Sequence, residues 1–74
     1  MNMLPETLEM FIRLENLYAE REYGIGYATR SRTQHDITRL EFDLEEHCSK
    51  IYDLPWFRLF TLWKVNPSYV DQVP

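Results

Sequence analysis

The sequence has a single cysteine, only two glycines and no apolar run of the length that crosses a bilayer. The lone Cys48 excludes an intramolecular disulfide, and a single thiol without a disulfide framework is typical of a reducing cytoplasm. A transmembrane helix needs about 20 consecutive apolar residues, so we expect no membrane span. The first residues contain neither a basic segment nor an apolar run, which predicts no secretory signal and a cytoplasmic protein.

An excess of basic residues is also missing. The chain carries 8 Lys or Arg against 12 Asp or Glu, which gives a net charge of −4. Proteins that bind nucleic acid usually present a basic face. A role dominated by nucleic-acid binding is therefore not expected.

Residue types that hold metals or perform catalysis are few. The one sequence cluster of this kind consists of Asp43, His47 and Cys48, with His35 some turns earlier. A closed zinc site needs four ligands and a catalytic zinc site keeps three. Neighbours such as His47 and Cys48 diverge by about 100° on a helix, which opposes a nucleophile–base pair. We therefore expect no metal, no cofactor and no enzymatic activity, and interpret Cys48 as a small core residue.

The length of 74 residues indicates one domain, residues 1–74. A domain of this size buries only about 60% of the surface that its unfolded chain exposes. Such domains are usually stabilised by disulfides, a metal or oligomerisation. Because the first is excluded and the second poorly supported, we expect a homodimer or a bound partner.

The spacing of apolar residues predicts an all-α fold, a small three-helix bundle. Its helices are expected near residues 5–23, 33–52 and 54–65, followed by an irregular C-terminal tail. Short connections favour helices that are antiparallel in chain order.

Particular residues mark the expected ends of these helices. Gly24 predicts a left-handed end to the first helix, so that residues 24–32 form a connecting loop. Thr33, followed three positions later by Asp36, is typical of a helix start. Asp53 is a good N-cap for the third helix.

The second predicted helix has the clearest amphipathic pattern. Its apolar stripe consists of Ile37, Leu40, Leu44, Cys48 and Ile51. Phe42 lies almost opposite this stripe. A single exposed phenylalanine can be accidental, but the other two helices also carry surplus apolar surface. We therefore interpret Phe42 as a contact residue.

The third predicted helix is the most apolar part of the chain and contains both tryptophans. Its apolar side chains cover most of the helix circumference, whereas packing on one neighbour needs a stripe of about 100° or a little more. An apolar surplus of this kind marks a surface for a partner. We predict that Trp56, Phe57 and Trp63 bind a protein partner.

Two charged segments are further candidates for partner binding. Four acids in six positions, Glu41, Asp43, Glu45 and Glu46, form either a solvated helix face or a contact for a basic patch on a partner. Arg30 and Arg32 form either a solvated loop or an anion-binding pair. Two arginines are a weak footprint beside the clusters that mark nucleic-acid binders, which favours the solvated loop.

These features predict a non-catalytic protein–protein interaction module. We expect a small acidic regulator or inhibitor that binds a larger protein as a homodimer, and its size resembles that of small bacterial or phage regulators. The alternative is an accessory protein that binds nucleic acid through the Arg30/Arg32 loop, with Tyr23 and Tyr27 as stacking platforms. Nucleic-acid binding would weaken steeply with added salt, whereas an apolar interface would barely respond.

Overall fold

The computed structural model of the chain describes residues 3–24 and 26–65, the side chains of residues 27–29 excepted. Three α-helices lie within this part of the chain: α1 (Pro5–Tyr23), α2 (Tyr27–Tyr52) and α3 (Trp56–Val65). The described residues contain no strand, and the predicted all-α, three-helix fold is confirmed. The predicted C-terminal tail lies outside the described residues.

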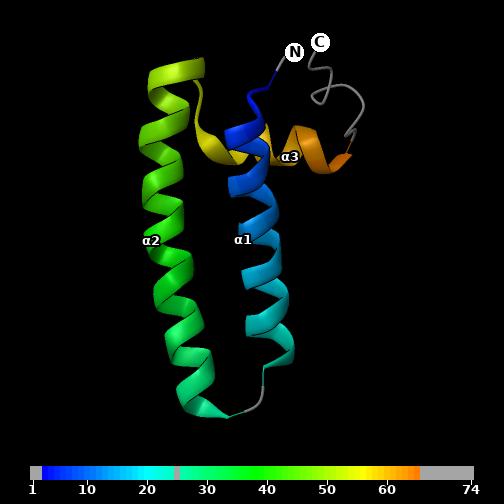
Figure 1. Ribbon diagram of the computed structural model, residues 1–74, viewed down its shortest axis with the longest axis vertical. Coiled ribbons are helices and arrows are strands. Elements are labelled where there is room, and N and C mark those ends of the chain that lie inside the picture. The colour runs from blue at the N-terminus through cyan, green and yellow to red at the C-terminus, as the bar shows by residue number, and fades with distance from the viewer. Residues whose placement is uncertain (1–2, 25, 66–74) are drawn as a thin grey trace.

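The helices form a hairpin with a crosspiece. α1 and α2 run antiparallel side by side, and α3 crosses one end of this hairpin behind α1 (Figure 1). The prediction that all three helices are antiparallel in chain order is therefore wrong for α3. With only 10 residues, α3 is short enough to pack its apolar side across the hairpin instead of along one helix.

The connection between α1 and α2 is shorter than predicted. α2 begins at Tyr27, so the connector comprises residues 24–26 rather than 24–32. Gly26 makes the turn with a φ of +89°, a backbone conformation that glycine adopts without strain. Gly24 has a φ of −67° and a ψ of 146°, so the predicted left-handed end at this residue is wrong.

The interpretation of Thr33 as a helix start is also wrong. Thr33 lies inside α2 and is only 3% exposed. The first turn of α2 forms well before it, where the Arg30 N–H donates to the carbonyl oxygen of Gly26 at 3.3 Å. Alanine and arginine before Thr33 are strong helix formers, and their preference prevails over the capping signature.

The start of α3 differs from the prediction as well. Asp53 ends α2 in the left-handed conformation, with φ 56° and ψ 37°, rather than capping α3. Aspartate tolerates this backbone region better than most residues, so one residue type can mark either a helix start or a turn. The first turn of α3 is closed by the Arg58 N–H, which donates to the carbonyl oxygen of Pro55 at 3.2 Å.

The core lies where the three helices meet. Its buried hydrophobic residues are Met3, Phe11, Leu14, Ile37, Leu40, Leu44, Cys48 and Leu59. The predicted stripe of the second helix is thereby confirmed for four of its five members. The exception is Ile51, which lies in the last turn of α2 and is 47% exposed.

An aromatic cluster holds α3 on the hairpin. The Phe11 ring of α1 lies 5.4 Å from Phe60 and 5.8 Å from Trp63, measured between ring centroids. Phe60 in turn lies 5.9 Å from Trp56 and 6.2 Å from Tyr18. Aromatic pairs at these separations add about 0.5–1.5 kcal/mol each beyond the burial of their area. α3 is therefore anchored mainly through its aromatic side.

Candidate functional site

The sides of α3 that face away from the hairpin carry exposed apolar residues. Val65 is 79% exposed, Phe57 58% and Leu62 39%; we call these three residues the α3 surface. Trp56 and Trp63 are half-buried and pack against the core. Of the predicted partner-binding residues of this helix, only Phe57 therefore presents most of its side chain to solvent.

Phe42 is a second exposed apolar residue, on α2. It is 76% exposed, so its predicted exposure is confirmed. It precedes the fully buried Leu44 by two positions, and two positions correspond to about 200° around a helix. Phe42 consequently points away from the core, and its role as a contact residue stays a prediction.

The four acids of the second helix do not form one surface. The Glu41 carboxylate accepts a hydrogen bond from the Tyr18 hydroxyl at 2.6 Å, which ties α2 to α1. Asp43 lies on the rim of a groove between these two helices. Glu45 and Glu46 are exposed, and Glu46 pairs with Lys50 at 3.0 Å. Glu41 therefore has a structural partner within the fold, while the other three remain accessible.

The two arginines of the predicted loop lie on α2. Arg30 and Arg32 are both exposed, but their positions differ by about 200° around the helix. They consequently project to opposite sides and do not form one anion-binding pair. Tyr23, 81% exposed at the end of α1, lies near the same end of the hairpin, while the side chain of Tyr27 lies outside the described residues.

A partly buried polar network joins the start of α1 to the end of α2, and sequence reasoning missed it. Thr7, fully buried, has its hydroxyl oxygen 2.7 Å from Nε2 of His47 and 2.8 Å from the hydroxyl of Tyr52. The Leu4 N–H donates to the same tyrosine hydroxyl at 2.9 Å. No group of three metal-ligand residues occurs in the part of the chain that the structure describes. The histidine that sequence reasoning weighed as a metal ligand thus has a hydrogen-bonding role.

Cys48 lies in the core, as predicted. Burial, and after it the nearby Glu45 carboxylate, raise the pKa of the thiol to about 11. A thiol with so high a pKa is almost entirely protonated at neutral pH and is a poor nucleophile. Burial and the hydrogen bond to Glu41 likewise raise the pKa of Tyr18 above its usual value.

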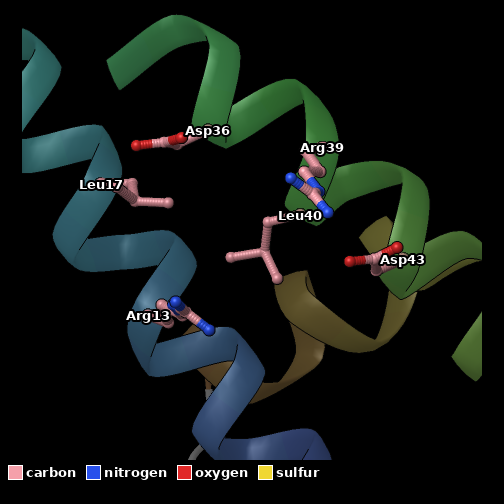
Figure 2. Close-up of a pocket in the computed structure, with 6 residues that line it drawn as sticks. All are labelled: Arg13, Leu17, Asp36, Arg39, Leu40 and Asp43. Atoms are coloured by element: carbon pink, nitrogen blue, oxygen red, sulfur yellow. The ribbon is translucent and has the colours of Figure 1, made fainter. Parts of the chain in front are cut away.

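A groove of about 380 Å³ runs between α1 and α2 (Figure 2). It is lined by two arginines, two aspartates and two leucines: Arg13, Leu17, Asp36, Arg39, Leu40 and Asp43. We call this surface the groove face. Sequence reasoning did not identify it, because the lining residues come from two helices whose relative register the sequence does not reveal. The feature of the sequence that could have indicated the groove is the presence of charged residues beside the apolar stripe of α2.

Comparison with known proteins adds no functional assignment. No protein-family model matches the chain, and neither a curated protein nor a solved structure matches it. Within residues 3–24 and 26–65, none of the helices combines the length and apolar character that a membrane span requires.

Proposed function

We propose that the chain is a non-catalytic protein-binding module, a small cytoplasmic regulator or inhibitor that acts on a larger protein as a homodimer. The observation that carries this proposal is the exposure of large apolar side chains on two helices. Phe42, Phe57 and Val65 are each more than half exposed. Exposed apolar surface of this kind marks protein interaction sites.

The way in which α3 is anchored supports the proposal. One side of the helix is occupied by the core contacts of Leu59 and by the ring pairs of Phe60. The α3 surface is left for another molecule. A rigid helix that is held from one side and apolar on others is a suitable platform for a protein partner, since aromatic residues are enriched in the centres of interfaces.

The test is photo-crosslinking from the α3 surface in lysate of the source cells. A photoreactive phenylalanine analogue replaces Phe57, and the matched control carries it at Ser31, which is exposed near the start of α2. We expect a covalent adduct with one larger protein from position 57 and none from position 31. Excess unlabelled chain should suppress the adduct, and Val65→Ser in the labelled chain should weaken it.

Equal labelling from both positions, or no adduct from position 57, would contradict this use of the α3 surface. The folded state of each labelled chain is checked by circular dichroism. The control also separates specific contact from indiscriminate labelling of abundant proteins.

A second candidate function is nucleic-acid binding at the hairpin end. The observation that favours it is the exposure of Tyr23 and Arg30 at the same end of the hairpin, because aromatic rings stack on bases and arginine binds phosphate. The divergence of Arg30 and Arg32 weakens it. Binding to single-stranded DNA that falls steeply with added salt and is lost in Arg30→Ala would favour this candidate over the first.

A further inference from the structure

The groove face lies on the side of the hairpin that α3 leaves open. α3 contacts α1 through Glu15, whose carboxylate lies 3.2 Å from Nζ of Lys64, and through Tyr18, whose ring lies 6.2 Å from Phe60. Arg13 precedes Glu15 by two positions, which turns it about 200° around α1. It therefore projects away from α3, and in Figure 2 the ribbon of α3 lies behind the groove residues.

The charges of the groove face are balanced and placed in register. Hydrogen bonds between Thr7 and His47 near one end of the hairpin and between Tyr18 and Glu41 further along fix the alignment of α1 with α2. Arg13 lies between Thr7 and Tyr18 on α1, and Asp43 lies between Glu41 and His47 on α2, so this pairing brings them to similar levels of the hairpin. They line the groove from opposite helices (Figure 2).

The middle of the groove is apolar. Leu17 and Leu40 point toward the space between the helices, and Asp36 and Arg39 complete the rim on α2 (Figure 2). The six lining residues carry two positive and two negative charges. Among the described residues, neither Arg13 nor Asp43 has an ion-pair partner, so both are available to another molecule.

We propose that the groove face binds a second copy of this chain, with the two-fold axis parallel to the hairpin. A rotation about such an axis sets α1 of one copy against α2 of the other and keeps every residue at its own level. Arg13 then faces Asp43 of the second copy, and Leu17 faces Leu40 of the second copy. Because a two-fold interface is self-complementary, each contact occurs twice.

The result is an antiparallel four-helix bundle. Each helix is antiparallel to both of its neighbours, an arrangement that such bundles commonly adopt. The two α3 helices lie on the outside, where the α3 surface stays free for a different protein. The proposal thus deepens the homodimer part of the proposed function and names its interface.

Charge distinguishes this arrangement from its main alternative. A two-fold axis across the hairpin, centred on the leucines, would set α2 against α2 of the second copy and bring Asp36 toward Asp43. Like charges in such positions oppose association.

The test is a pair of charge reversals, Arg13→Asp and Asp43→Arg, with the mass of each variant measured by sedimentation equilibrium. Each single reversal turns two attractive contacts into two repulsive ones and should weaken the homodimer by about 30-fold or more. An equimolar mixture of the two variants should form a heterodimer, because both of its contacts are again between opposite charges. The double variant R13D/D43R should regain the wild-type homodimer.

Reversal of exposed charges away from the groove face, Arg30→Asp and Glu45→Arg, serves as the matched control and should leave dimerisation unchanged. Thermal unfolding of each variant establishes that it is folded. A wild-type chain that is monomeric at every concentration would overturn the proposal, as would a dimer that is insensitive to the single reversals or a mixture that does not associate. A single variant that is monomeric but still forms the adduct from position 57 would show that the α3 surface binds its partner without dimerisation. Failure of the groove-face homodimer and failure of the α3 surface are therefore distinguishable.

Discussion

Two leucines of α3 provide the sharpest test of how this helix is placed. Leu59 is fully buried, whereas Leu62, less than one turn further on, is 39% exposed. Truncation of a buried leucine to alanine costs about 2–5 kcal/mol, the sum of lost transfer free energy and of a cavity. Leu62→Ala should cost about 1 kcal/mol or less, because much of its side chain already contacts water.

The loss expected for Leu59→Ala is large for a chain of this size. The free energy of unfolding of small domains begins at about 5 kcal/mol, so the variant forfeits a substantial part of it. A loss of 1 kcal/mol shifts the Tm of such a domain by about 4–8 °C. We therefore expect Leu59→Ala to lower the Tm by about 8–40 °C and Leu62→Ala by about 8 °C or less.

Urea unfolding followed by two signals measures the loss in the free energy of unfolding, and thermal unfolding measures the shift in Tm. Tryptophan fluorescence reports on α3, which contains both Trp56 and Trp63, and far-ultraviolet circular dichroism is dominated by the longer α1 and α2. α3 is too short to be a stable helix in isolation, so Leu59→Ala should release it from the hairpin. Equal costs for the two leucines, or a larger cost for Leu62→Ala, would mean that α3 is rotated from the position described.

Three further predictions concern the network, the thiol and the exposed phenylalanine. Thr7→Val keeps the shape of the side chain but removes both hydrogen bonds, to His47 and Tyr52; urea unfolding should show a loss of about 1–3 kcal/mol, and no loss would mean that the network is dispensable. Because the pKa of Cys48 rises from 9.0 to about 11 on folding, the folded state holds the thiol proton more tightly. The resulting stabilisation is complete below pH 9, the unfolded value, and is lost as the pH rises toward the folded one. Between these limits the free energy of unfolding should fall less in Cys48→Ala than in the wild type, and parallel curves would refute the shift. Phe42→Ala should change the free energy of unfolding by no more than about 0.5 kcal/mol, and a large loss would show that this ring is part of the core.

The sequence predicted the helices better than their ends. The spacing of apolar residues identified all three helices, because a helix that buries one side has apolar residues at every third or fourth position. The predicted ends of the helices depended on single residues, and each of these residue types also occurs in other backbone positions. Thr33 has the chemistry of a cap but lies inside α2, and Asp53 makes a left-handed turn instead of a helix start.

The candidate sites depended on contacts that sequence order does not contain. Thr7, His47 and Tyr52 meet only because α1 and α2 pair in one register. The groove face arises from the same pairing. Exposure was predicted correctly for Phe42, since it follows from the phase of one helix alone. By contrast, Trp56 and Trp63 are half-buried because α3 crosses the hairpin, and that crossing was not predictable from the phase of α3.

The measurement that tests the account most directly is the solution mass of the wild-type chain by light scattering, over a wide range of concentration and at low and high salt. A module that acts as a homodimer should show twice the 9.0 kDa of one chain at both salt concentrations, with only modest weakening at high salt because the leucines persist as contacts. A mass of one chain at every concentration and salt would contradict the homodimer, and with it the assignment of the groove face.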